Sequence, residues 1–152
     1  AAVYGNSSAP CSEDQELKPV NDYGKAKIFS EGVIRMMMAD YSILRLGNVY
    51  SKRADHGFIS KLLQGSNILY GDGMRSRDYV HLHDVANAII EAALTDKWQG
   101  IYNIATGVAT TSEELFKRIG KGKPIFEKKD EIEDSCLDIS KAKANGFNPF
   151  AI

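Results

Sequence analysis

A tyrosine and a lysine stand four residues apart in the segment "PVNDYGKAKIFSEG", as Tyr23 and Lys27. Residues with this spacing lie about 40° apart around a helix axis, so both side chains can reach one site. A tyrosine hydroxyl, with a pKa of about 10, is a poor proton acceptor at neutral pH, but an ammonium group held close favours the phenolate. Such a pair could move a proton to or from a substrate hydroxyl.

The spacing alone is weak support for a site. Composition alone predicts about 0.6 Tyr-x-x-x-Lys matches in a chain with these tyrosines and lysines. The simple alternative is an exposed helix turn with a solvated lysine. A catalytic interpretation therefore depends on the elements that surround the pair.

The segment that carries the pair is expected to form a helix that starts with Asp22 as its cap and runs to about Asp40. Its methionines, residues 36–38, are expected to fill a core or an interface. Before the helix, residues 5–19 are rich in Ser, Pro, Asn and Asp and favour a loop. Residues 1–4 favour the end of a buried strand, and residues 41–50 favour a second buried strand.

Short helices and strands are expected to alternate through the rest of the chain. Apolar spacing favours helices at residues 58–63 and 86–94, the second led by Asp84, and a capping-box pattern predicts another helix at Thr111 and Glu114. "DISKAKANGF" favours a short helix that stops at Gly146. "NILYGDG", "RDYVHLHD" and "GIYNIATG" favour strands, and residues 121–133 favour a charge-rich connection. This alternation predicts an α/β fold with mostly parallel strand pairing.

The composition excludes some classes of partner. The net charge is -1 with 26% charged residues, so no basic field is available to hold nucleic acid. The apolar runs are too short and interrupted to span a membrane, and no signal-peptide pattern opens the chain, so a cytoplasmic setting is expected. Cys11 and Cys136 form no disulfide framework and no metal spacing, and free thiols are expected.

Six motifs stand in one order along the chain: "AAVYG", "DYGKAK", "LRLGNVY", "YGDGMRSRDYVHLHDVANAI", "YNIATG" and "DISKAKANGF". Together they resemble the extended short-chain dehydrogenase/reductase family, specifically its NAD-dependent nucleotide-sugar epimerases and dehydratases. The resemblance implies a Rossmann-like, doubly wound, mostly parallel sheet, of which this chain is the C-terminal part, with a small α/β substrate-binding lobe. Residues 1–50 would belong to the dinucleotide-binding domain and residues 51–152 mainly to the lobe, with residues 78–105 returning to the Rossmann sheet.

The resemblance also implies a role for the Tyr-x-x-x-Lys pair. Tyr23 matches the general acid/base of the family. Lys27 matches the lysine that lowers the pKa of that tyrosine and binds the ribose hydroxyls beside the nicotinamide of NAD. Both residues are thus candidate catalytic and cofactor-binding residues.

Four further residues match substrate-binding positions of the family. Asn48 and Arg77 match residues that contact the substrate diphosphate, where the fork of donors on arginine suits phosphate oxygens. Tyr70 resembles the position that packs on the nucleotide base, and a strand-end core aromatic is an equal alternative. Lys128 is the nearest substitute for an arginine that the family places on the second phosphate. For Asn48 a simple turn role, and for Arg77 a surface ion pair, stay open as alternatives.

Some parts of the family pattern have no counterpart in the chain. The glycine-rich turn for the dinucleotide pyrophosphate is missing, and the Ser or Thr of the catalytic triad falls just ahead of Ala1. We therefore expect a processed or truncated polypeptide that exposes a sheet edge and an apolar face. Such a chain should be poorly soluble or associate, as a homodimer or with the missing N-terminal half.

The function expected from the resemblance is an NAD-dependent nucleotide-sugar 4-epimerase that acts on a UDP-hexose. A 4,6-dehydratase is a rival, but Ala1 and Ala2 stand where dehydratases carry an Asp-Glu pair. A keto-sugar reductase of the family and a non-catalytic nucleotide-sugar-binding module also stay open. His81 and His83 would share a strand face as a metal pair, but no third ligand is evident and no metal site is expected.

Overall fold

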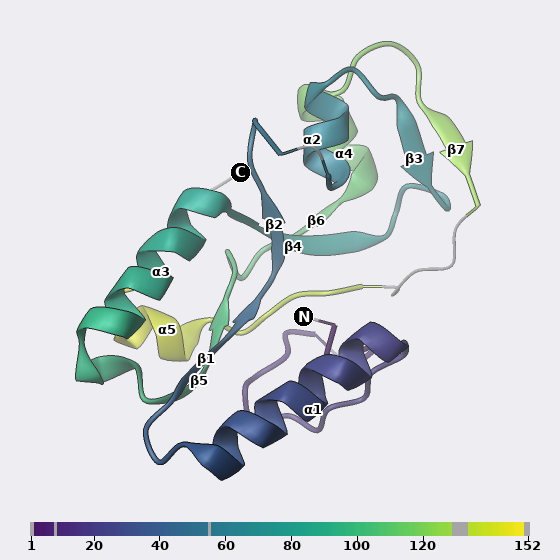
Figure 1. The fold of residues 1–152 in the computed structure, drawn as a ribbon. Helices are drawn as coiled ribbons and strands as arrows, with labels where there is room; N and C mark the ends of the chain where they lie inside the picture. Colours follow the sequence, from purple (N-terminus) through teal and green to yellow (C-terminus); the bar gives the residue numbers. More distant parts are fainter. Residues whose placement is uncertain (1, 8, 55, 129–133, 151–152) are drawn as a thin grey trace.

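Helices and strands alternate along the chain in the computed structural model, which describes residues 2–7, 9–54, 56–128 and 134–150 (Figure 1). The elements are α1 (Asp22–Met37), β1 (Ser42–Leu46), β2 (Asn48–Tyr50), α2 (Phe58–Leu63), β3 (Ile68–Tyr70), β4 (Ser76–His81), α3 (Leu82–Leu94), the 3-10 turn η1 (Asp96–Trp98), β5 (Gly100–Ile104), β6 (Ala109–Thr111), α4 (Ser112–Ile119), β7 (Ile125–Glu127) and α5 (Ser140–Ala144).

Most strand pairs are parallel. β1 pairs with β5, β2 with β4 and β3 with β7 in parallel, and β6 runs antiparallel to β4. Within the described residues β5 is the only strand beside β1, so one edge of β1 carries no partner there. The predicted α/β class with mostly parallel pairing is confirmed.

The predicted strand over residues 41–50 is two strands, because the chain changes partner at Gly47. β1 follows β5 up to Leu46, and β2 follows β4 from Asn48. A Cβ at Gly47 would approach the backbone oxygen of Asp78 to 2.8 Å, so the crossing needs a residue without a side chain. Asn48 is therefore held at the point where the two strand pairs meet.

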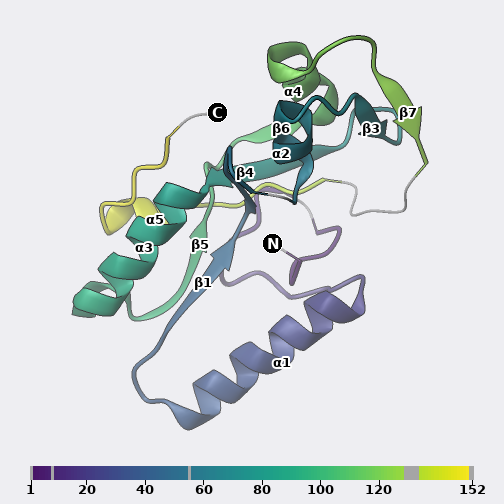
Figure 2. The same cartoon turned by 45° about the horizontal axis from the view of Figure 1, so that its top comes forward.

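Three apolar clusters hold the elements together. α3 and α5 lie on one side of β1 and β5, and α1 lies on the other (Figures 1 and 2). The first cluster includes Trp98, Tyr102 and Ala142. The second joins Val3 and Tyr4 of the N-terminal segment to Ala105, which follows β5, and to Leu137 and Ile139. The third cluster is separate and joins α2, β3, β4 and α4 through Ile59, Leu62, Leu69, Tyr79, Leu115 and Phe116.

The N-terminal segment and α1 differ from their predictions. Residues 2–6 form turns around Gly5, whose φ is +59°, so the described part of the predicted strand over residues 1–4 is not extended; Ala1 lies outside the described residues. Asn21, not Asp22, caps α1, and the helix ends at Met37 rather than near Asp40. The three methionines are at least 55% exposed, so they fill no core of this chain.

Several other elements match their predictions with shifted bounds. α2, β3, β4 and β5 lie where they were expected, and α4 has the predicted capping box. α3 begins earlier than predicted, at Leu82, because the ring of His81 caps it. Residues 121–133 were predicted to be a connection, but they include β7; residues 129–133 lie outside the described part. No described helix is both long and apolar enough to cross a membrane.

Candidate active site

α1 presents Tyr23 and Lys27 side by side. The side chain of Asn21 accepts a hydrogen bond from the N–H of Gly24 at 2.9 Å, which starts the helix immediately before the tyrosine. The Nζ atom of Lys27 lies 5.3 Å from the centre of the Tyr23 ring, and Tyr23 is 63% exposed. The shared face expected from the spacing of four is confirmed, and the catalytic role stays a prediction.

A glycine lets the first turn of α1 approach the N-terminal segment. A Cβ at Gly24 would lie 2.6 Å from the backbone oxygen of Ala2, and Gly24 is the buried residue of this helix. The close approach puts the start of the helix against residues 2 and 3, which line the same cavity as Tyr23.

That cavity has a volume of about 370 Å³, and we call it the Tyr23 cavity. α1 contributes Tyr23, Lys27 and Glu31 to its lining, β1 contributes Arg45, and Asn48 joins the lining as the first residue of β2. A phenol hydroxyl and an ammonium group thus border one space. This arrangement suits proton transfer to or from a bound hydroxyl.

A second cavity, of about 290 Å³, adjoins the first, and we call it the arginine cavity. The two share Asn48 and Val49 in their linings. The structure brings together Asn48, Tyr70 and Arg77 in the arginine cavity, although they come from three different strands. Lys61 of α2 and Arg75, which directly precedes β4, line this cavity as well. Three cationic side chains, with Arg77, thus border a space large enough for phosphate groups.

β4 fixes the positions of Asn48 and Arg77. Asn48 lies opposite Tyr79 in the parallel β2–β4 pair, and its Nδ2 atom donates to the backbone oxygen of Asp78 at 3.4 Å. One guanidinium nitrogen of Arg77 donates to the backbone oxygen of Ser76 at 2.8 Å. The two residues implied for diphosphate binding are therefore both fastened to the backbone of one strand.

The side chain of Asp78 fastens β4 to two other segments of the chain. Its side chain is fully buried; Oδ1 accepts from the N–H and hydroxyl of Thr106 at 2.9 and 2.7 Å, and Oδ2 accepts from the N–H of Gly107 and Leu137 at 3.0 and 3.1 Å. Burial raises the pKa of Asp78, and these hydrogen bonds oppose that effect. The carboxylate joins β4 to the turn after β5 and to the C-terminal segment.

Sequence reasoning missed several residues of the site, although some left a signal. Arg75 stands two positions before Arg77, and residues with that spacing point to the same side of a strand. Lys61 lies in the predicted helix over residues 58–63. Glu31 continues the four-residue spacing of Tyr23 and Lys27 along α1.

Two predicted residues or pairs lie elsewhere. Lys128 follows β7, is exposed, and does not belong to the described linings of the two cavities, so its role stays a prediction. The prediction that His81 and His83 share a strand face is wrong, because the strand ends at His81 and His83 is helical. Cys11 and Cys136 are free thiols, as predicted.

Known proteins resemble this chain in sequence. The family described as the "NAD dependent epimerase/dehydratase family" matches residues 1–105. A Methanocaldococcus jannaschii protein with the name "Putative UDP-glucose 4-epimerase" is 36% identical over 97% of this chain and 55% of its own length. The UDP-glucose 4-epimerase of Mycolicibacterium smegmatis is 34% identical over 78% of this chain and 42% of its own length.

Solved structures agree with the sequence comparison. The UDP-glucose 4-epimerase of Thermotoga maritima, solved with UDP-glucose, matches 99% of this chain and 56% of its own with a TM-score of 0.84 at 29% identity. That of Thermus thermophilus, solved with NAD, matches 99% of this chain and 57% of its own with a TM-score of 0.77 at 27% identity. The expected Rossmann-like α/β fold is confirmed. The chain spans about half the length of the curated relatives it matches, and it belongs to the NAD-dependent epimerase/dehydratase family.

Proposed function

We propose that the protein represented by this chain is an NAD-dependent nucleotide-sugar epimerase that interconverts UDP-glucose and UDP-galactose. The observation that carries the proposal is that the linings of the two cavities share Asn48 and Val49. A proton-transfer pair borders one cavity and cationic side chains border the other. A hexose linked to a nucleoside diphosphate presents hydroxyl groups and phosphates at two such sites.

The arginine cavity would bind the UDP part of the substrate. Arg77, Arg75 and Lys61 offer cationic donors to the diphosphate, and the amide of Asn48 offers a neutral one. Tyr70 supplies an aromatic surface for the uracil ring. Residues 51–152 would thus contribute mainly to a substrate-binding lobe around the separate apolar cluster of α2, β3, β4 and α4. Residues 78–105 and α5, whose Ala142 belongs to the first cluster, would pack with the Rossmann sheet instead.

The Tyr23 cavity would hold the reacting sugar carbon. Tyr23, as the phenolate, would accept the proton of the C4 hydroxyl, and the nearby ammonium of Lys27 would stabilise the phenolate. NAD, when bound, supplies reversible hydride acceptance from the same carbon. After the keto-sugar has turned its other face to the site, Tyr23 would return the proton to the C4 oxygen as the hydride returns to that face of the carbon, which inverts C4.

The residues present fit the nicotinamide end of such a cofactor. The cavity beside Tyr23 is about 370 Å³ and is lined by Lys27, whose ammonium group suits ribose hydroxyl groups. The sequence of this chain contains no Gly-x-x-Gly-x-x-Gly turn for the pyrophosphate. The proposal assigns this chain the substrate-binding and proton-transfer residues of the site and the contact of Lys27 with the cofactor ribose.

The test is the conversion of UDP-galactose to UDP-glucose by the natural protein and its variants. We expect Tyr23→Phe to lower kcat by about 10² to 10⁴-fold, because the general acid/base is removed. Lys25→Gln is the matched control, since Lys25 pairs with Asp22 at the exposed start of the same helix. A Tyr23→Phe variant with kcat within threefold of the unsubstituted protein would overturn the catalytic assignment.

A keto-sugar reductase is the second candidate, because the dTDP-4-dehydro-6-deoxyglucose reductase of Escherichia coli is 28% identical over 99% of this chain and 54% of its own length. A reductase consumes one reduced nicotinamide cofactor per turnover, whereas an epimerase regenerates its cofactor in each cycle. Measuring cofactor oxidation in the same assay separates the two. Tight UDP-glucose binding with neither reaction would instead favour a non-catalytic binding module.

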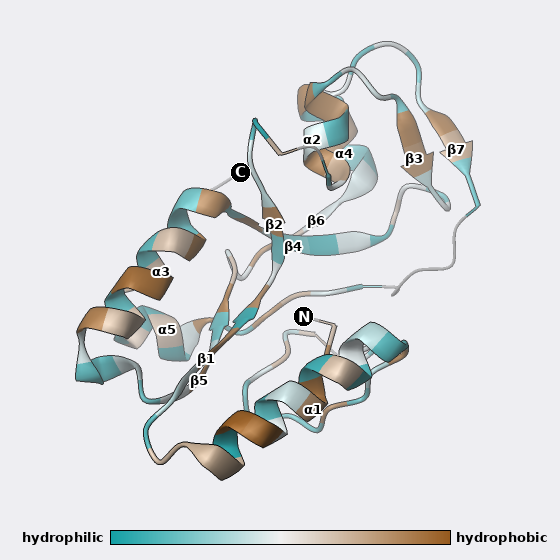
Figure 3. Cartoon of the chain, viewed as in Figure 1, coloured by the Kyte–Doolittle hydropathy of each residue, from teal (hydrophilic) through white to brown (hydrophobic). Residues whose placement is uncertain are grey.

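We further propose a homodimer that pairs α1 of one subunit with α1 of the other. Phe29, Val33, Met36 and Met37 form an exposed apolar stripe on α1, with exposed fractions of 74%, 37%, 88% and 77%. Figure 3 shows hydrophobic stretches along this helix among hydrophilic ones. Sedimentation of the natural protein should give a dimer, and Phe29→Glu with Met36→Glu should give a monomer. A dimer that survives both substitutions would exclude this interface.

A further inference from the structure

The orientation of α1 is only weakly fixed by apolar packing. Of the side chains on this helix, Ile28 is the one that packs against the second apolar cluster, and it is only partly buried. Most other positions are exposed, including Tyr23 and the apolar stripe. Within this chain, polar contacts between α1 and β1 must therefore contribute to fixing the rotation of the helix about its own axis, in addition to any contact that the proposed dimer would make.

A buried ion pair provides that contact. The Nε atom of Arg45 donates to the two carboxylate oxygens of Glu31 at 3.0 and 3.3 Å, and a terminal nitrogen donates to one of them at 2.7 Å. The side chains are only 4% and 12% exposed. Two nitrogens of a planar guanidinium fix both the distance and the direction of the carboxylate, so the pair restrains α1 against β1.

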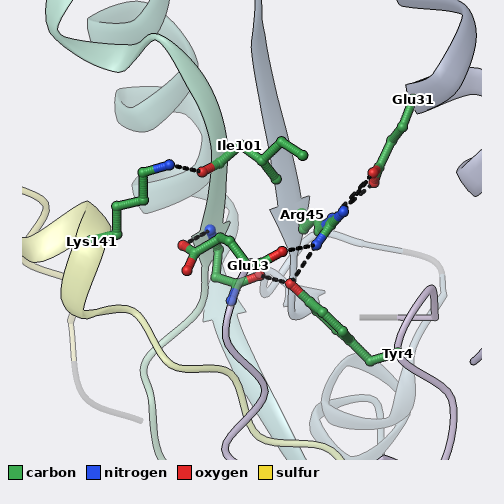
Figure 4. A network of polar contacts seen from close by, with 7 residues as sticks. Tyr4, Glu13, Glu31, Arg45, Ile101 and Lys141 are labelled. Atoms are coloured by element: carbon green, nitrogen blue, oxygen red, sulfur yellow. Dashed lines mark hydrogen bonds and ion pairs between the residues drawn. The ribbon is translucent and has the colours of Figure 1, made fainter. Parts of the chain in front are cut away.

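Arg45 is itself held from the opposite side (Figure 4). Its other terminal nitrogen donates to the hydroxyl of Tyr4 at 2.9 Å and to the backbone oxygen of Glu13 at 3.0 Å. The Tyr4 hydroxyl donates to Asn103 at 2.7 Å, and burial raises the pKa of Tyr4, so this hydroxyl keeps its proton. The N-terminal segment therefore holds the guanidinium of Arg45 independently of the contact with α1.

The carboxylate of Glu31 also has the correct helical phase. Tyr23, Lys27 and Glu31 are successive residues at a spacing of four, and all three line the Tyr23 cavity together with Arg45. Glu31 lies about 12 Å along the axis from Tyr23. Glu31 is also about 80° around the axis from Tyr23 and lines the same cavity, so an anchor there restrains both the rotation and the axial position of the tyrosine.

From this arrangement we propose that Glu31 and Arg45 are positioning residues, which orient α1 so that Tyr23 and Lys27 face the reacting sugar. The proposal rests on the proposed function of Tyr23. A helix rotation of about 10° would move the tyrosine hydroxyl by roughly 1.5 Å, given a helix radius of about 2.3 Å plus the length of the side chain. A displacement of about 1 Å at a reacting group can reduce a rate by about 100-fold.

The test separates positioning from stability by replacing both charges at once. Glu31→Met with Arg45→Met removes the directional contact, yet it leaves no unpaired charge in the buried site, so the variant should fold. In the natural protein we expect kcat for UDP-galactose to fall about 30- to 100-fold, with KM within about threefold. The KM is expected to stay nearly unchanged because the cationic side chains of the arginine cavity lie on elements other than α1 and β1.

Two further variants define the contact more closely. Arg45→Lys keeps the charge but loses the fork of donors, so kcat should fall about tenfold. Lys25→Gln, which breaks an exposed ion pair on the same helix, should leave kcat unchanged. Amide hydrogen exchange gives a readout without turnover: residues 22–37 should exchange faster in the double methionine variant, while β1 and β5 keep their protection.

The outcomes distinguish the two proposals. If Tyr23→Phe retains activity, the proposed function fails, whatever the ion pair does. If Tyr23→Phe loses activity but the folded double methionine variant keeps kcat within threefold, the positioning role is wrong. A matching loss in kcat with accelerated exchange confined to α1 would support it.

Discussion

A fully buried carboxylate and a largely buried one hold the two halves of the site in different ways. Asp78 lies on β4 between two residues that line the arginine cavity. It accepts hydrogen bonds from the backbone N–H groups of Thr106, Gly107 and Leu137 and from the hydroxyl of Thr106. Glu31 borders the Tyr23 cavity and accepts from the guanidinium of Arg45. One carboxylate is satisfied mainly by the backbone, and the other by a side chain of opposite charge.

The difference decides which contact can be replaced. An ion pair can be exchanged for two apolar side chains, because both of its charges leave together. Backbone N–H groups cannot be removed by substitution, so the loss of their acceptor leaves them buried and unpaired. We therefore expect the Asp78 network to dominate stability and the Glu31–Arg45 pair to dominate geometry.

The largest effect on stability is expected for Asp78→Asn. Each carboxylate oxygen of Asp78 accepts at least two hydrogen bonds, so in either orientation the amide NH₂ would face at least two donors. The loss should be about 4 kcal/mol in the free energy of unfolding, measured by urea denaturation at pH 7. Asp72→Asn is the control, because Asp72 is exposed and accepts a hydrogen bond from the N–H of Met74, and its substitution should cost below about 0.5 kcal/mol. A loss below about 1 kcal/mol for Asp78→Asn would contradict the anchoring role.

The next largest effect should come from Glu31→Met alone. It leaves the charge of Arg45 buried without its carboxylate, and the unfolding free energy should fall by about 3 kcal/mol. Adding Arg45→Met should recover most of that loss, to within about 1 kcal/mol of the unsubstituted protein. Additive losses in the double variant would show that Arg45 stabilises the fold mainly through Tyr4 and Glu13 rather than through the pair.

The contrast also explains what the sequence could predict. Local patterns located most elements, since the apolar spacing of α2, the capping box of α4 and the alternation in β4 are each contained in a short segment. The shared face of Tyr23 and Lys27 is likewise local. The break at Gly47 was missed because it depends on the backbone of Asp78, which lies far along the chain.

Long-range contacts account for the remaining differences. The partner of Arg45 on α1, and the donors to Asp78 from two separate segments, depend on how distant elements pack. The N-terminal segment has the apolar character of a strand but forms turns, although Val3 and Tyr4 are buried as such a strand would require. Apolar character thus predicted the burial of these residues but not their backbone conformation.

A smaller effect, on binding, concerns the cations of the arginine cavity. Arg75→Gln should raise the KM for UDP-galactose about tenfold, because a charge-assisted hydrogen bond to phosphate is lost. Lys128→Gln should change it less than about twofold, since Lys128 is exposed and outside the described lining of this cavity. Steady-state kinetics of the natural protein measure both values. The opposite ranking would support the prediction that Lys128 binds the second phosphate.

The smallest effect is a pH dependence at the start of β4. The hydroxyl and N–H of Ser76 donate to Asp134 at 2.6 and 2.8 Å, and these bonds lower the pKa of Asp134 from its ordinary 3.8. A lowered pKa contributes stability above the unfolded value, which is lost as the pH falls through the folded one. Because Asp134 is exposed, solvent screening keeps the contribution below about 1 kcal/mol.

Ser76→Ala tests this sign, because it removes the hydroxyl donor and keeps the N–H. The variant should be less stable than the unsubstituted protein at about pH 6, and the difference should shrink as the pH falls below about 4. Asp78 should give the opposite slope, since burial raises its pKa and the folded chain then takes up a proton more readily than the unfolded chain. A difference for Ser76→Ala that stays constant from about pH 6 to about pH 3 would mean that the hydroxyl stabilises β4 without acting through the charge of Asp134. The backbone N–H of Ser76, which the substitution keeps, would then be the donor that lowers the pKa of Asp134.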